Sequence, residues 1–212
     1  MNVPLERAAA WGHGFVTGLL VGILVAGLVC ANASSAEACD RHEFTDRAGR
    51  CVMKHDAPRP SWGDPDRNCR STRNDILVRE ALPYSLRMSE DGCKVLSGLW
   101  VDPYSGAFIE GTPSGTIEID HLLPQSAARS MRRWDRETFE QFYRDPLNLT
   151  VSSRAANQAK SNRFPLSDWL PENEKATCWV TRRLDAVRRK YELRFKPLDM
   201  LHLSEWLERC RP

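Results

Sequence analysis

The feature that most constrains this chain is a pair of adjacent polar residues, Asp120 and His121, at the end of a short β-type run. Residues 117–120 alternate between apolar and acidic side chains, which is typical of a strand, and Pro124, which cannot donate to a strand ladder, follows closely. Adjacent side chains on a continuous strand point to opposite faces. We therefore expect the strand to end at this pair, because only then can both side chains serve one site.

Three polar residues further along the chain can complete such a site. Asn148 lies in a second β-type run, and Asn157 and Lys160 lie in a helix-type run that follows it. Lys160 comes three residues after Asn157, so both side chains occupy the same face of a helix. The sequence therefore predicts that two strands and one helix bring these groups together.

These residue types suit the hydrolysis of a phosphodiester bond. Water must lose a proton and the charge on the phosphate must be neutralised, and one histidine with one divalent cation can do both. His121 is the predicted general base. Asp120 and Asn157 are the predicted metal ligands, because carboxylate and amide oxygens suit Mg²⁺ together with several waters. Lys160 is predicted to direct its positive charge toward a phosphate.

The pattern D-H-L-L-P-Q-S, then N-L-T, then N-Q-A-K resembles the HNH endonucleases, which are also called His-Me finger or ββα-metal nucleases. Further segments between Cys69 and Leu193 are similar to a secreted group of HNH proteins. That group is related to the C-terminal nuclease domain of modification-dependent restriction enzymes. The segments are C-R-S-T-R-N-D-I-L, W-V-D-P-Y-S-G, D-P-L-N-L and D-W-L-P.

The resemblance implies a role for each matched position. His121 matches the general base, Asp120 the first metal ligand, and Asn157 the last ligand, which is histidine in many members. Asn148 matches the middle position, whose residue orients the base and holds the loop of the ββα unit. Lys160 matches a basic residue frequent in this branch. The resemblance also implies a divalent cation, Mg²⁺ with Mn²⁺ as the alternative, and a nucleic acid substrate.

Charge is unevenly distributed, although the net charge is only +2. From residue 121 onward Lys and Arg outnumber Asp and Glu, whereas in residues 37–120 they are outnumbered. The predicted site thus lies in the basic part of the chain, as a phosphate-backbone substrate would favour. Within that part, Arg154 and Arg163 flank the helix-type run and are predicted to contact the substrate.

The first 36 residues are typical of an export signal. An uncharged apolar run at 15–30 precedes small residues, and its length lies between that of a signal core and that of a membrane span. We expect a cleaved signal peptide, with an uncleaved membrane anchor as the alternative. Either one places the remaining chain outside the cytoplasm, secreted or periplasmic, and the protein contacts a membrane only if the segment stays attached.

Cysteine usage agrees with export. Seven cysteines are present, and one of them, Cys30, lies in the apolar run. The even number that remains in an exported domain predicts disulfides. Sequential pairing is preferred because each bridge then closes a local loop: Cys39–Cys51, Cys69–Cys93 and Cys178–Cys210.

We therefore predict an α+β protein with a ββα-metal core, flanking helices and disulfide staples. It has three parts: a signal peptide or anchor at 1–36, an irregular N-terminal arm at 37–68, and the HNH nuclease domain at 69–212. Helices are expected at 69–82, 125–144 (divided by a cap at Asp135), after a cap at Ser152 or Ser153, at 178–193 and at 199–210, and strands at 93–100, 107–110, 115–120 and 147–151. Trp62 and the later tryptophans are expected to be packing residues.

The predicted function is that of an exported, metal-dependent endonuclease that hydrolyses phosphodiester bonds in DNA, with RNA as a second substrate left open. Two alternatives stay open. The first is a non-catalytic nucleic-acid-binding module on the same fold, and the second is a disulfide-rich envelope protein with no nucleic acid role. The sequence favours no particular oligomeric state.

Overall fold

The computed structural model describes residues 42–45, 51–53, 60–113 and 115–211. The chain divides into two units, Met1–His42 and Glu43–Pro212, and the fold below is that of the second. The predicted signal or anchor segment lies outside the described residues. None of the helices in the described part of the chain has the length and apolar character needed to cross a membrane.

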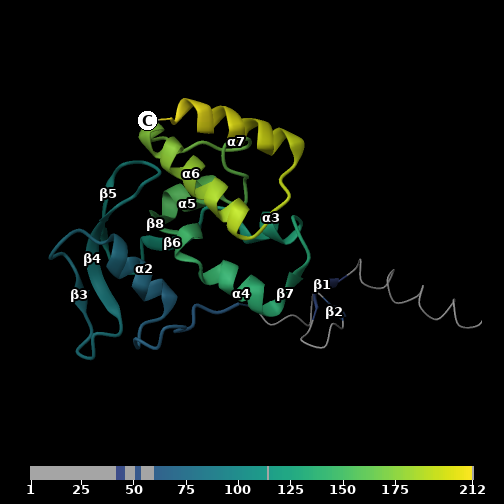
Figure 1. Ribbon diagram of the computed structural model, residues 1–212. Helices are drawn as coiled ribbons and strands as arrows, with labels where there is room; N and C mark the ends of the chain where they lie inside the picture. Colours follow the sequence, from purple (N-terminus) through teal and green to yellow (C-terminus); the bar gives the residue numbers. More distant parts are fainter. Residues whose placement is uncertain (1–41, 46–50, 54–59, 114, 212) are drawn as a thin grey trace, which may run out of the picture. The chain divides into compact units, whose positions relative to one another are not determined.

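An antiparallel hairpin followed at once by a helix forms the core of the unit (Figure 1). Its elements are β6 (Ile117–His121), β8 (Leu149–Ser153) and α5 (Arg154–Lys160). In the register of the hairpin, Ile119 pairs with Val151 and His121 pairs with Leu149. The prediction that the first strand ends at His121 is confirmed. Ser153 caps α5, because its hydroxyl accepts a hydrogen bond from the backbone N–H of Ala156 at 3.1 Å.

The connection between β6 and β8 is mostly helical, as predicted. It consists of α3 (Gln125–Arg129), β7 (Trp134–Asp135), α4 (Arg136–Arg144) and the 3₁₀ helix η2 (Pro146–Asn148). Asp135 divides it and caps α4 by accepting from the N–H of Thr138 at 2.8 Å. The prediction that Asn148 lies on the second strand is wrong. Asn148 ends η2 instead, because the Asp145 carboxylate accepts from the N–H of Leu147 at 2.9 Å and starts a short helix there.

A second sheet and a helix lie against one side of the hairpin. They are α2 (Thr72–Glu80), β3 (Arg87–Met88), β4 (Val95–Val101) and β5 (Phe108–Gly111), with β4 antiparallel to both neighbours. The Trp100 indole donates to the carbonyl of Leu77 at 2.8 Å and joins β4 to α2. The buried apolar side chains here are Ile76, Leu77, Val95, Trp100, Ile117, Ile119, Leu149 and Val151.

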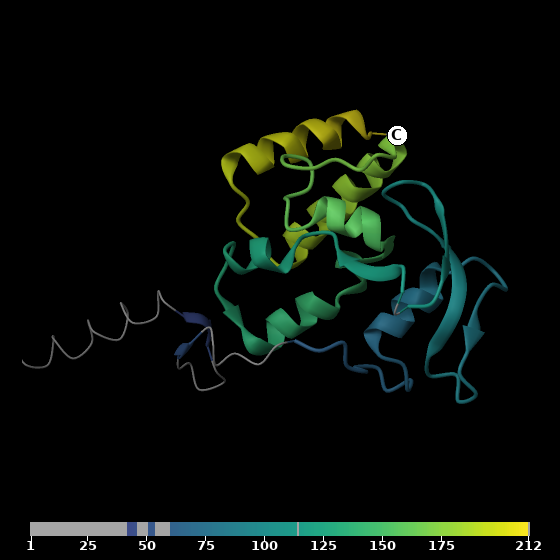
Figure 2. The same ribbon diagram turned by 180° about the vertical axis from the view of Figure 1, so that it is seen from behind.

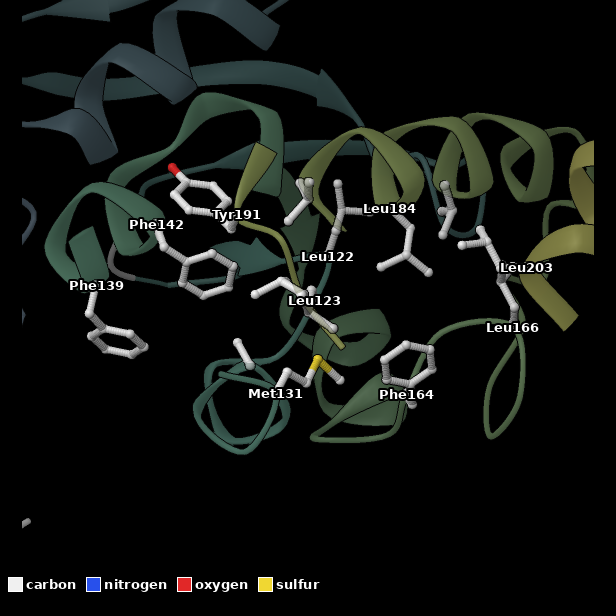
Figure 3. Packing of buried hydrophobic residues seen from close by; sticks show 14 of the residues in the cluster. Leu122, Leu123, Met131, Phe139, Phe142, Phe164, Leu166, Leu184, Tyr191 and Leu203 are labelled. Carbon is white, nitrogen blue, oxygen red and sulfur yellow. The ribbon is translucent and has the colours of Figure 1, made fainter. Parts of the chain in front are cut away.

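Two long helices, α6 (Glu174–Lys190) and α7 (Pro197–Arg209), lie side by side in both views (Figures 1 and 2). They cover a larger core that α3, α4 and the residues after His121 complete. Figure 3 shows Phe142 beside Tyr191 in this core, and their ring centroids are 5.3 Å apart. Leu122 and Leu123 are fully buried there, so the chain directly after His121 is anchored in the core.

Two of the three predicted disulfides are confirmed. Cys69 is bonded to Cys93, and Cys178 to Cys210, where the bridge joins α6 to the end of α7. The predicted Cys39–Cys51 pair lies outside the described residues, because Cys39 is not among them.

The segment at 37–68 was expected to be irregular, but it contains two short strands, β1 (His42–Thr45) and β2 (Cys51–Met53). β1 pairs with β2 and, in parallel, with β7, where Phe44 is in register with Trp134. This segment therefore forms a three-stranded sheet with β7. The two-residue β7 offered no period-2 pattern from which the pairing could be predicted.

Candidate active site

A cleft of ≈ 420 Å³ lies at the end of β6. Four of the predicted site residues line it: Asp120, His121, Asn157 and Lys160. The volume falls within the range of about 300–1,000 Å³ that is usual for ligand sites. The structure thus brings together the ends of β6 and α5 in the way that the sequence predicted.

His121 is held by one nitrogen of its ring. Its Nε2 lies 2.8 Å from the backbone carbonyl oxygen of Tyr143. Since a carbonyl oxygen only accepts hydrogen bonds, we assign the proton to Nε2, which makes Nδ1 the nitrogen with a free lone pair. A histidine in this state can take a proton from water.

Burial keeps His121 neutral. Its side chain is largely enclosed, and this lowers the pKa of the imidazole to about 4, although the bond to the Tyr143 carbonyl works in the opposite direction. The nearby Lys160 ammonium lowers the pKa of the imidazole further. The ring is therefore an unprotonated, available base at neutral pH.

Two aromatic rings surround the imidazole. Trp62 stacks on His121 with a centroid distance of 5.8 Å and an interplanar angle of 23°. Tyr143 lies 4.8 Å from His121 and 4.8 Å from Trp62. Both residues line the cleft.

Asp120 is bonded to two buried partners. The Tyr104 hydroxyl donates to its Oδ2 at 2.5 Å, and the Lys160 ammonium donates to its Oδ1 at 3.0 Å. Lys160 also donates to the backbone carbonyl of His121 at 2.8 Å. The sequence predicted that Lys160 points toward a phosphate. In the structure the Lys160 side chain is only 1% exposed. Its ammonium group bonds to the Asp120 carboxylate and the His121 carbonyl instead, and so holds the end of β6 in place.

Burial also governs the titration of this cluster. It raises the pKa of Asp120 and lowers the pKa of Lys160, and the attraction between the two groups offsets part of each shift. The pKa of Tyr104 lies well above its usual range because of burial first and then because of the Asp120 charge. The hydroxyl of Tyr104 therefore remains a donor to Asp120 at any ordinary pH.

Asn148 is fully buried and does not line the cleft. Its Oδ1 accepts from the N–H of Leu123 at 2.8 Å, and its Nδ2 donates to the carbonyl of Leu123 at 3.2 Å. Its own carbonyl accepts from the N–H of Leu122 at 2.8 Å. These bonds hold the chain directly after His121.

Two arginines hold the loop that carries Asn148. Arg79 of α2 donates to the carbonyls of Pro146 and Leu149 at 3.1 and 3.0 Å. Arg183 of α6 donates to the carbonyls of Leu147 and Leu149 at 2.8 and 3.0 Å, and also to Pro146. These basic side chains are occupied inside the domain.

Asn157 and Arg154 share one partner, Glu118 of β6. The Asn157 Nδ2 donates to Glu118 at 2.7 Å, and the Arg154 guanidinium pairs with the other carboxylate oxygen at 3.1 Å. Asn157 also lines the cleft. Arg163 turns back on its own helix, where it donates to the carbonyls of Lys160, at 3.3 Å, and Ala159.

The donors in the cleft fit a hard divalent cation. Asp120 supplies a carboxylate with about four lone-pair positions, of which Tyr104 and Lys160 use only part, and Asn157 supplies an amide oxygen. In the part of the chain that the structure describes, no group of three or more His, Cys, Asp or Glu residues could hold a metal ion. Water and substrate oxygens would therefore complete the coordination, as is usual for Mg²⁺.

Three residues of the site were not predicted from the sequence. Tyr104 lies in the W-V-D-P-Y-S-G segment that carried part of the resemblance, and its position there was the only available signal. Trp62 and Tyr143 had no such signal, because only the fold brings them to His121.

The strands β6 and β8 and the helix α5, with Asp120 and His121 at the end of β6, form the centre of an α+β domain. The family model for GmrSD restriction endonucleases, C-terminal domain, matches residues 72–192. This is more than half of the chain, so the chain belongs to that family and carries a nuclease domain that acts on DNA. No curated protein and no solved structure gave a match.

Proposed function

We propose that the protein is a metal-dependent endonuclease of the HNH type, in which His121 is the general base that activates water for attack on a DNA phosphodiester. One observation carries the proposal: His121 is held through Nε2 by a backbone carbonyl and lines the same cleft as Asp120 and Asn157. The family to which the chain belongs supports DNA as the substrate.

In this proposal each side chain has a distinct part. His121 takes the proton from the attacking water at Nδ1, and its imidazole ring becomes positively charged. The Tyr143 carbonyl holds this ring in place through Nε2. A bound phosphate beside the ring favours this protonated form, because opposite charges stabilise each other. Asn148 and Lys160 keep the strand end in position, through Leu123 and the His121 carbonyl respectively.

Asp120 and Asn157 would hold a divalent cation, Mg²⁺ first and Mn²⁺ second. When bound, the cation would neutralise charge on the phosphate and on the leaving oxygen. Arg154 would contact the substrate backbone, because its side chain is 51% exposed and its present partner is a half-exposed carboxylate that a phosphate can replace. Arg163 is the second proposed backbone contact; it is exposed at the end of α5.

Nicking of supercoiled plasmid tests the proposal. The purified protein is incubated with Mg²⁺, with Mn²⁺, and with EDTA, alongside His121→Ala and His202→Ala. His202, on α7, is the matched control because it lies outside the cleft. We expect cation-dependent nicking that His121→Ala lowers by at least about 100-fold and His202→Ala leaves unchanged. Full activity of His121→Ala, or DNA binding without any nicking, would contradict the proposal.

We also propose that the domain works outside the reducing cytoplasm. The Cys69–Cys93 and Cys178–Cys210 bonds support this, because structural disulfides persist in oxidising compartments. Alkylation of the denatured native protein, followed by mass spectrometry, should find these four cysteines unmodified unless a reductant is added first. Free thiols at all four positions in protein taken from its natural source would refute it.

A further inference from the structure

Trp62 contacts the proposed base from a segment that precedes α2. Its ring stacks on the His121 ring, and together with Tyr143 it closes a triangle of three mutually contacting rings. The family match begins at residue 72, so Trp62 lies outside the matched range, whereas His121 and Tyr143 lie inside it. The cleft at His121 is thus completed by a residue that the family match does not include.

The backbone around Trp62 is fixed. The N–H of Thr72 at the start of α2 bonds with the carbonyls of Trp62 and Gly63, at 3.1 and 2.9 Å. Gly63 has a φ of +40°, and a Cβ there would lie 3.1 Å from the Arg144 guanidinium of α4. A side chain at position 63 would therefore be strained and crowded. The backbone at Trp62 and Gly63 is thus bonded to the start of α2, which places the indole at His121.

The Tyr143 carbonyl fixes one atom of the imidazole but not the plane of the ring. A single hydrogen bond allows rotation about its own axis, which would move Nδ1 away from an attacking water. The two rings in contact with His121 restrict that freedom, because aromatic rings prefer particular mutual orientations. Displacing a reacting group by about 1 Å can lower the rate by about 100-fold, so this restraint matters for catalysis.

We propose that Trp62 is a positioning residue for His121, and that the segment before the family-matched range is part of the active site. The inference rests on the proposed role of His121 as the base. Trp62 acts through the plane of the imidazole and does not need to touch the DNA. Its removal should therefore lower kcat and leave KM unchanged.

The test uses plasmid nicking by the full chain carrying Trp62→Leu, Trp62→Phe or Trp62→Ala. Leucine keeps an apolar side chain, although a smaller one, against the neighbouring core and has no ring, whereas phenylalanine keeps a ring. We expect kcat to fall by about 10- to 100-fold for Trp62→Leu and Trp62→Ala, with KM within about twofold, and Trp62→Phe to recover most of kcat. Trp206→Leu is the matched control, because Trp206 is a half-buried tryptophan of α7 outside the cleft.

A second measurement separates positioning from folding. Thermal unfolding shows which variants are folded, and ¹⁵N NMR of the His121 ring reports its tautomer. We expect one tautomer protonated at Nε2 in the wild type and in Trp62→Phe, and exchange broadening or a mixture in folded Trp62→Leu.

Three results would overturn the inference. The first is an unchanged kcat in Trp62→Leu. The second is a raised KM with normal kcat in Trp62→Leu, which would make Trp62 a DNA contact. The third is a loss of activity in Trp62→Phe equal to that in Trp62→Leu. His121→Ala, measured in the same assay, tests the proposed function separately. If that variant is inactive while Trp62→Leu is fully active, only the positioning role fails.

Discussion

Two carboxylates on one face of β6 have opposite surroundings. Asp120 belongs to a buried cluster at the cleft, which we call the floor and define as Tyr104, Asp120, Asn148 and Lys160. Glu118 belongs to a more exposed cluster, which we call the rim and define as Glu118, Arg154 and Asn157. The ion pair of each carboxylate is almost equally short, 3.0 Å to Lys160 and 3.1 Å to Arg154. The Lys160 and Asp120 side chains are 1% and 7% exposed, whereas those of Arg154 and Glu118 are 51% and 30% exposed.

Burial, not distance, therefore decides what each pair can do. The floor cannot exchange its partners for water, so removing one partner leaves a buried group uncompensated. The rim can exchange its partners for solvent, a cation or a phosphate at small cost. We infer that the floor positions the chemistry and the rim meets the substrate.

The largest effect is expected from Lys160→Met in the floor. It leaves Asp120 buried without its counter-charge, and we expect the free energy of unfolding to fall by about 3–5 kcal/mol in urea denaturation. Adding Asp120→Asn should restore part of this loss, since no buried charge then remains. A double variant no more stable than Lys160→Met would show that the ion pair is not the cause.

A smaller loss is expected from Asn148→Ala. The N–H and carbonyl of Leu123 would lose their partner, which costs about 1–3 kcal/mol of unfolding free energy. The kcat for plasmid nicking should fall as well, because the chain after His121 is released. Asn162→Ala is the control, since Asn162 is an exposed residue of the cleft wall. If Asn148→Ala and Asn162→Ala lowered the unfolding free energy and kcat equally, the floor would not differ from exposed residues of the cleft.

The smallest effect on stability is expected from Glu118→Gln in the rim. The pair with Arg154 is exposed, so the free energy of unfolding should change by less than about 1 kcal/mol. Removing a negative charge beside Arg154 should tighten DNA binding at low salt, and the gain should fade as salt screens it. Fluorescence anisotropy with labelled DNA at several salt concentrations measures this. A stability loss as large as that of Lys160→Met would contradict the inference that burial makes the floor pair more important for stability than the rim pair.

Much of this site could be predicted from local pattern. The strand end at His121, the helix that carries Asn157 and Lys160, the cap at Asp135 and two disulfides each depend on residues close in sequence or on simple pairing rules. The α+β class and the resemblance to restriction-enzyme nuclease domains are confirmed as well. Most of these signals act within one turn or one strand, and the disulfides follow from pairing neighbouring cysteines, so a single sequence contains them.

Other parts depended on contacts between distant segments. Trp62 contacts His121 across 59 positions of sequence, and Tyr104 contacts Asp120 across 16. Neither contact therefore produces a periodic pattern in the local sequence from which it could be predicted. The direction of Lys160 was misjudged for another reason: lysines are almost always exposed, and only a buried carboxylate and carbonyl together reverse that preference. The helical turn at Asn148 could have been anticipated from Asp145-Pro146, which is typical of a turn.

The burial of Lys160 also has a practical consequence for labelling. Acylating dyes react with amines that they can reach, and Lys94, Lys175, Lys190 and Lys196 are all exposed, whereas Lys160 is sealed beneath the cleft. A fluorophore coupled to amines under native conditions should attach to the former set and spare Lys160. The domain can thus be tagged for single-molecule tracking on DNA without chemical damage to the lysine of its active site.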